Sequence, residues 1–157
     1  MSPAQGEWLI EAIATGDLER VRPNMAAAGD RVNVARRHIR SARSLADDDP
    51  TLAISACHDA IRKAVTGHMA AAGLRPRGGD GAHRIVLDYA RRQLSQIISE
   101  DDLMEADDLR RDRAVAEYGD FASRQIDSTR VRTAADVADR VVSAIASSLA
   151  AQPQQGG

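Results

Sequence analysis

The chain has 157 residues, of which 43% are hydrophobic and 3% aromatic, and it carries a formal net charge of -2 at pH 7. This length can bury a core without a disulfide or metal staple, and it predicts a single domain over residues 1–152 followed by a disordered tail over 153–157. The nearly balanced charge gives no global field for a polyanion, so nucleic-acid binding would need a local cationic patch.

Three helices are predicted in the first half of the chain from apolar residues at helical spacing. A short leading helix covers about residues 4–14, and long helices follow over about 25–46 and 50–72. Pro50 comes directly after Asp49, which suits a capping carboxylate followed by a proline at the first helical position. The end of this helix is expected at Gly73, where a left-handed residue is favoured.

The second half of the chain predicts three further helices, over about residues 81–98, 99–118 and 131–149. Ser99 followed by Asp102 is typical of a helix start, and Gly119 is expected to end that helix. No alternating pattern of a β-strand is present, and most connectors are short, which favours antiparallel neighbours. We therefore expect an all-α fold, an up-and-down helical bundle of four to five long helices with a short leading helix.

The sequence favours a cytoplasmic protein that does not enter the membrane. Its lone cysteine, Cys57, can form no internal disulfide, which fits a reducing compartment. The N-terminal stretch has no basic region before its short apolar run, so it is not expected to be a signal peptide. No apolar run approaches the roughly 18 residues of a membrane span.

The common catalytic and ligand-binding motifs are missing from the sequence. It has no phosphate-binding glycine loop, no GxSxG elbow and no HExxH pair. Its histidines lack paired ligand spacing, so neither a metal nor another cofactor is predicted. His68 lies on an apolar stripe, where a hydrogen-bonded core histidine is the simpler interpretation.

The most informative segment is LRRDRAVAEYGDF, residues 109–121. Arg111 and Tyr118 are seven residues apart and so lie within roughly 20° of each other, on a stripe with Met104 and Val115 that is expected to lean inward. Arg113 points roughly 140° away from Tyr118. A guanidinium and a phenol among apolar neighbours need polar partners.

Two interpretations of these residues require no known motif. In the first, the stripe is structural: Arg111 pairs with a carboxylate such as Asp59, and Tyr118 donates a hydrogen bond to a backbone carbonyl. In the second, the bundle core holds a small-ligand pocket lined by Cys57, His68 and small alanines.

The order of residues in this segment resembles the HEPN superfamily (higher eukaryote and prokaryote nucleotide-binding domains), as a divergent bacterial member. Helical-bundle members often carry Arg, then Asn or Asp, three residues and His, extended in many toxins to His-x-Tyr. Here an Arg-Asp pair is followed by Glu-Tyr in the penultimate helix. The upstream SACHDAIRKAVTGHMAAAGLR helix, with its Gly-rich loop and GAHR, is similar to many of these domains, so the resemblance covers about residues 25–150.

The resemblance implies a catalytic set of Arg111, Asp112 and Tyr118. It also places Ala116 at the motif histidine, and alanine can neither transfer a proton nor stabilise charge. Ribonuclease activity, which would be that of a metal-independent endoribonuclease, is therefore expected to be absent or weak. His83, at the start of the preceding helix, is a stand-in for the missing imidazole.

Nucleic-acid contacts are expected from Arg110, Arg111 and Arg113 of the same helix. A shifted register would pair Arg113, instead of Arg111, with Tyr118, as some relatives use a shorter spacing. The helical-face argument favours Arg111.

The resemblance also implies partners. HEPN domains commonly dimerise through facing motif helices, which would build one groove from two copies of Arg111 and Tyr118. This implies a homodimer that binds RNA or a nucleotide, as in a toxin–antitoxin-type system. The alternative is a non-catalytic dimerisation or interaction protein, partnered with a nucleotidyltransferase or another neighbour, in which Tyr118 is a modification site.

Overall fold

The structure is a computed structural model that describes residues 1–78, 82–118 and 126–153. Of residues 115–118 it describes the backbone alone. The described residues form six helices and one two-stranded sheet. The expected all-α helical bundle is therefore confirmed.

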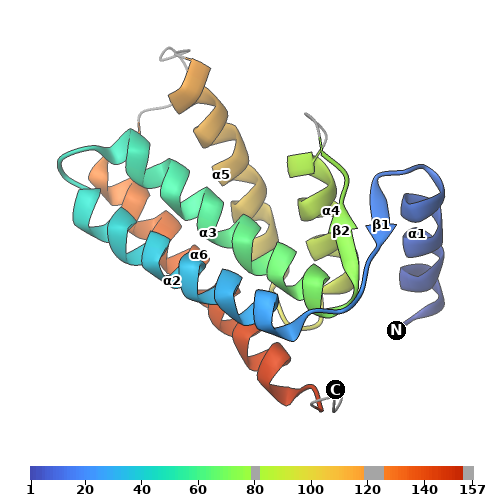
Figure 1. The fold of residues 1–157 in the computed structure, drawn as a ribbon. Coiled ribbons are helices and arrows are strands. Elements are labelled where there is room, and N and C mark those ends of the chain that lie inside the picture. The colour runs from blue at the N-terminus through green and yellow to red at the C-terminus, as the bar shows by residue number, and fades with distance from the viewer. Residues whose placement is uncertain (79–81, 119–125, 154–157) are drawn as a thin grey trace.

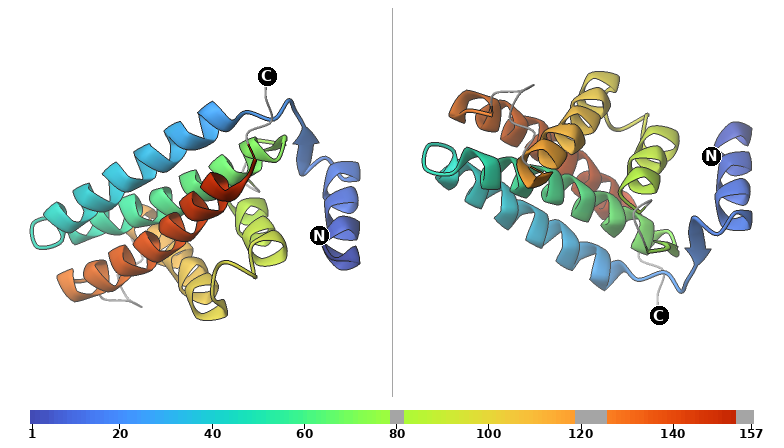
Figure 2. Two further views of the ribbon diagram at one scale, coloured as in Figure 1. Left: turned by 90° about the horizontal axis from the view of Figure 1, so that it is seen from below. Right: turned by 90° about the horizontal axis from the view of Figure 1, so that it is seen from above.

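The bundle is built around α3 (Pro50–Ala71), which packs against α2 (Met25–Leu45) and α6 (Ser128–Ala151). Figures 1 and 2 show these three long helices side by side. Two shorter helices, α4 (Ala82–Gln93) and α5 (Glu100–Tyr118), pack on the side of α3 that faces away from α2 (Figure 2). As a result α3 contacts four other helices and has the most buried residues in the fold.

The leading helix α1 (Pro3–Ala14) lies at the edge of the molecule, beside α4 (Figure 1). Its start is fixed by a capping box, in which the Gln5 N–H donates to the Ser2 hydroxyl and the Gln5 side chain accepts from the Ser2 N–H. The Gln5 side chain also donates to the Arg92 carbonyl oxygen at 2.9 Å. This polar contact joins α1 to α4 across 87 residues of sequence.

Local sequence signals explain where α3 begins and ends. The Asp49 carboxylate accepts from the Leu52 N–H at 3.1 Å, and Pro50 occupies the first helical position, as predicted. Gly73 follows the helix with a φ of +73°, which confirms the expected left-handed residue. Small residues then let α3 approach α2 closely, since a Cβ atom added at Gly67 would lie 3.1 Å from the Ala28 carbonyl oxygen.

Two short strands correct the expectation of a chain without β structure. Strand β1 (Leu18–Arg20) pairs antiparallel with β2 (Leu74–Pro76), with Leu18 opposite Pro76. Three residues are too few to show the alternation by which strands are recognised in a sequence. The sheet ties the segment after α1 to the segment after α3, and Glu19 adds ion pairs to Arg75 and Arg77.

Helix boundaries in the second half of the chain differ from expectation by a few residues. The helix predicted to reach residue 98 ends at Gln93, and a hydrogen-bonded turn follows in which the Ile98 N–H donates to the Leu94 carbonyl at 2.9 Å. Helix α5 then starts with the predicted cap, since the Asp102 N–H donates to the Ser99 hydroxyl at 3.1 Å. In the described part of the chain, no helix combines the length and apolar character needed to cross a membrane.

Candidate functional site

The inward face of α5 is not the face that the sequence predicted. Leu103, Ala106 and Leu109 are buried against the bundle, whereas Met104 is 60% exposed. Arg111 lies roughly 160° around the helix from Leu109, and its side chain is 55% exposed. The expectation that Met104 and Arg111 share an inward stripe is therefore wrong, because the apolar residues that pack against α3 lie on the opposite side of the helix.

The Arg111 guanidinium is held on the surface by carboxylates of its own helix. It donates to Asp107 at 2.9 Å and to Asp108 at 3.1 Å, one turn earlier in the sequence. The described partners of Arg111 are thus these two carboxylates, and not Asp59, which the structural interpretation had offered as an example. Arg110 also donates to Asp107, at 3.3 Å.

Asp107 consequently neutralises much of this surface. Burial alone would raise the pKa of its carboxyl group, but the hydrogen bond from Arg110 and the charges of Arg111, Arg110 and Arg91 outweigh that effect and lower the pKa. The carboxylate is therefore charged at neutral pH. An external anion must compete with it for Arg110 and Arg111.

Asp112 lies at the contact between α5 and α6. It is 1% exposed, and Arg130 of α6 donates to it from Nε at 2.9 Å. Arg130 also donates from Nη1 to Glu105 at 3.0 Å. This arrangement gives Asp112 a structural partner and orients its carboxylate toward α6, away from the exposed guanidinium of Arg111.

Arg113 belongs to the opposite side of α5 from Arg111. It follows the buried Ala106 by seven residues, so the two lie within roughly 20° of each other on the inner face. Its charge lowers the pKa values of Asp59 in α3 and of His83 in α4. Arg113 is thus the motif-helix arginine that lies close to the groups of two neighbouring helices.

Two histidines from different helices lie close together, and the charge of Arg113 acts on one of them, His83. The rings of His58 in α3 and His83 in α4 have centroids 5.6 Å apart and are tilted by 38°. His58 is only 4% exposed. The buried Nδ1 atoms of both rings have no hydrogen-bond partner among the described residues.

Arg62 and Asp59 complete this group on α3. Arg62 follows His58 by four residues, so both side chains leave the same face of the helix. The Asp59 carboxylate is 3.8 Å from His58 Nδ1, which is longer than a hydrogen bond. We call His58, Asp59, Arg62, His83 and Arg113 the histidine cluster.

The electrostatics of the histidine cluster favour a neutral imidazole at His83. Burial lowers the pKa of His83 most, and the positive charges of Arg62 and Arg113 lower it further. The pKa of Asp59 is lowered chiefly by His58 and also by Arg113 and Arg62, although burial opposes this. At pH 7 the cluster therefore combines two guanidinium groups, one carboxylate and an unprotonated His83 ring.

The other histidine of interest, His68, has a structural role in the core. Its Nδ1 is 2.9 Å from the Tyr89 hydroxyl, and Tyr89 is buried. Burial lowers the pKa of His68 and raises that of Tyr89, so both groups stay neutral around pH 7. The hydrogen-bonded histidine predicted from the apolar stripe is present.

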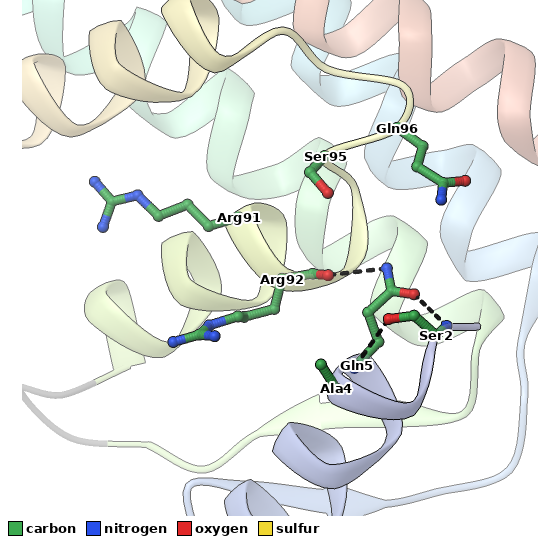
Figure 3. A pocket seen from close by; sticks show the side chains of 7 residues that line it. All are labelled: Ser2, Ala4, Gln5, Arg91, Arg92, Ser95 and Gln96. Carbon is green, nitrogen blue, oxygen red and sulfur yellow. Dashed lines mark hydrogen bonds between the residues drawn. The ribbon is translucent and has the colours of Figure 1, made fainter.

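A polar surface pocket of about 250 Å³ lies between α1 and the end of α4 (Figure 3). Its lining residues are Ser2, Ala4, Gln5, Arg91, Arg92, Ser95 and Gln96. None of them comes from α3, so this pocket does not correspond to the core pocket expected beside Cys57 and His68. Arg91, moreover, is committed to Asp107 at 3.4 Å and to Asp88 at 3.9 Å.

The structure thus brings together some of the residues predicted for the site and separates others. Arg113 and His83 lie in the histidine cluster, whereas Arg110 and Arg111 lie on the outer surface of α5. The side chains of Tyr118 and Ala116 lie outside the described residues. Across the described ranges, no group of three His, Cys, Asp or Glu residues is placed to hold a metal ion.

Sequence reasoning missed His58 and Arg62. The available signal was their spacing of four residues, which puts an imidazole and a guanidinium on one face of the long helix. The same helix carries an apolar stripe, and that stripe directed attention to packing instead of to polar neighbours.

Comparison with known proteins adds the family. No curated protein and no solved structure matches the chain. The family model described as the HEPN domain matches residues 28–148, which include α3, α4, α5 and the whole histidine cluster. The chain therefore belongs to the HEPN family.

Proposed function

We propose that this HEPN domain binds RNA or a nucleotide through its phosphate groups, acts as a homodimer, and has no more than weak ribonuclease activity. One observation carries the proposal: the rings of His58 and His83 lie 5.6 Å apart, and the charges of Arg62 and of Arg113 on the motif helix both act on His83. Guanidinium groups bind phosphate oxygens through charge-assisted hydrogen bonds, and an imidazole N–H can donate a further one.

The local charge favours phosphate binding at the inner face of α5, which carries Arg113, over binding at the outer face, which carries Arg111. Arg110 and Arg111 share their surface with Asp107 and Asp108, so little positive charge remains there. Among the described groups of the histidine cluster, by contrast, the two arginines accompany one carboxylate, Asp59. With so few cations and a net charge of -2, binding should be modest and should weaken as salt rises.

Weak or absent cleavage follows from the motif itself. In the Arg111 register the resemblance places Ala116 at the motif histidine, and in the shifted register Arg113 is paired with Tyr118, so neither register supplies an imidazole from α5. A phenol has an ordinary pKa of about 10, which makes it a poor base at pH 7. His83, which is neutral at pH 7, is the base that remains for any residual activity.

The proposed homodimer uses the outer face of α5. Met104 is a large apolar side chain exposed on this face, near the surface that holds Arg111. An exposed apolar side chain on the motif helix suits contact with a second copy of the same helix. Sedimentation of the wild type and of Met104→Glu would test this, with a weaker dimer expected for the variant.

Fluorescence anisotropy with a labelled single-stranded RNA at 50 mM salt tests the proposed binding. We expect saturable binding that weakens at 200 mM salt, and an affinity about tenfold lower for Arg113→Ala, as for loss of a charge-assisted phosphate contact. Arg132→Ala is the matched control, because Arg132 pairs with Asp47 on the exposed surface of α6. Absence of RNA and nucleotide binding at low salt, or equal losses in both variants, would refute the proposal.

A further inference from the structure

The His58 ring is placed as in a binding site and not as in an ordinary core. It is almost fully buried, yet its Nδ1 atom has no hydrogen-bond partner within the described ranges. A second ring, His83, faces it at 5.6 Å and has the same unsatisfied Nδ1. Folded proteins rarely bury polar atoms without partners, so two together point to a group that binds between α3 and α4.

The charges around these rings define what can bind there. His83 is influenced by Asp59 and Arg62 from α3, by Arg113 from α5 and by His58 itself. Among the described groups that act on His83, the two guanidinium groups outnumber the one carboxylate. A metal cation is disfavoured by this surplus, and the described residues contain no three-ligand group for one.

The local backbone adds to the preference for an anion. His83 is the second residue of α4, a helix of twelve residues, so it lies in the turn where backbone N–H groups and the helix dipole attract negative charge. The cluster thus combines side-chain cations, imidazole donors and a helix start.

We propose that His58, His83, Arg62 and Arg113 form a binding site for a phosphate monoester, such as the terminal phosphate of a nucleotide or of an RNA end. This inference rests on the proposed function and specifies which phosphate the domain recognises. A monoester carries up to two negative charges, which match the two arginines, whereas a diester within a chain carries one. The burial of His58 also favours the end of an RNA chain over its interior. A terminal phosphate needs room for RNA on one side only, whereas an internal phosphate needs room on both sides.

Affinity should depend on pH through His83. Its pKa is lowered in the free protein by burial and by Arg62, Arg113 and His58, so binding of a dianion should raise it and take up a proton. Affinity is therefore expected to increase as pH falls from 8 toward 6.5. Below about pH 6 the phosphate itself becomes protonated, and the gain should stop.

Histidine ring signals in the proton NMR spectrum of the full chain provide the test. The probes are inorganic phosphate, adenosine 5′-monophosphate and a dinucleoside monophosphate whose only phosphate is a diester. We expect saturable shifts of the His58 and His83 signals with the first two probes and at least about tenfold weaker binding of the third. His68, bonded to Tyr89, is the internal control whose signal should stay in place.

Variants separate specific binding from a general ionic effect. His83→Gln and Arg62→Gln should each weaken binding of adenosine 5′-monophosphate about tenfold in calorimetry. Arg132→Gln is the matched control, since Arg132 pairs with Asp47 on the exposed surface of α6 and belongs to no part of the histidine cluster. Because His83 and Arg62 are only partly buried, these variants are expected to fold.

Each alternative result has a defined meaning. Unmoved His58 and His83 signals, equal shifts at all four histidines, or equal affinity for the diester would overturn the monoester site. If the monoester site were overturned but RNA still bound through Arg113, the proposed function would stand without a monoester site. Saturable monoester binding in a protein that binds no RNA would instead support the site and remove the RNA part of the proposed function.

Discussion

The buried ion pair between α5 and α6 gives a sharp test of how the motif helix is held. In Arg130→Met the guanidinium is replaced by an apolar chain, so Asp112 loses a 2.9 Å hydrogen bond and Glu105 loses one of 3.0 Å. Asp112 is 1% exposed, so its carboxylate cannot simply turn into solvent. We expect the variant to fold but with a clearly lower free energy of unfolding.

The magnitude follows from the burial of the two partners. Removing one member of a buried ion pair typically costs about 3–5 kcal/mol. The Arg130 side chain is 22% exposed, and Asp112 has a further interaction, so water and that contact should reduce the loss. We therefore expect about 2–3 kcal/mol, which for a domain of this size lowers Tm by about 6–10 °C.

Urea and thermal unfolding followed by circular dichroism would measure this loss. Arg132→Met is the matched control, two residues along the same helix, because its pair with Asp47 is exposed and should contribute about 0–0.5 kcal/mol. Asp112→Asn should likewise lower stability, while the folded protein keeps its affinity for RNA. A loss below about 1 kcal/mol in Arg130→Met, or loss of RNA binding by a stable Asp112→Asn, would refute the structural role of Asp112 and favour a catalytic one.

Three further predictions follow from local geometry. Gly73→Ala should cost about 1–3 kcal/mol by urea unfolding, because φ is +73° and the new Cβ would lie 2.9 Å from the Val21 carbonyl oxygen, whereas Gly29→Ala, with open space around it, should be neutral or stabilising. Arg111→Ala should change the free energy of unfolding by less than about 0.5 kcal/mol and should reduce RNA affinity less than Arg113→Ala does. A larger loss of RNA affinity in Arg111→Ala, measured by anisotropy, would favour the register that starts from Arg111. The pKa of His68 is lowered by burial, so its contribution to stability is complete above the unfolded pKa of about 6.5 and is lost as pH falls through the folded value. The free energies of unfolding at pH 7.5 and 5.5 should therefore differ less in His68→Gln than in the wild type.

The helices could be predicted because their signals are local. Asp49 before Pro50, Gly73 after α3 and Ser99 before α5 each satisfy backbone groups within a few residues. The two strands were missed because their pairing depends on chain segments more than fifty residues apart, and neither segment has a pattern of its own.

The orientation of α5 could not be predicted in the same way. Its sequence is rich in charge on all sides, so periodicity defines no clear apolar face. Met104 and Val115 suggested one face, but Leu103, Ala106 and Leu109 form the buried one. The choice depends on the shape of α3 and α6, which the sequence of α5 does not contain.

If Ala116 takes the motif histidine position, as the resemblance implies, its consequences for binding and for cleavage differ. Binding needs donors and positive charge around the phosphate, and Arg62, His58 and His83 can supply these from helices other than α5. Cleavage also needs a proton acceptor placed against the attacking hydroxyl and stronger contacts in the transition state than in the bound state. A site that stabilises the bound state and the transition state equally increases the affinity for RNA but does not increase the rate of cleavage. For that reason we expect RNA ends to remain bound and uncut, and long incubation of a labelled RNA with the protein should return it at full length.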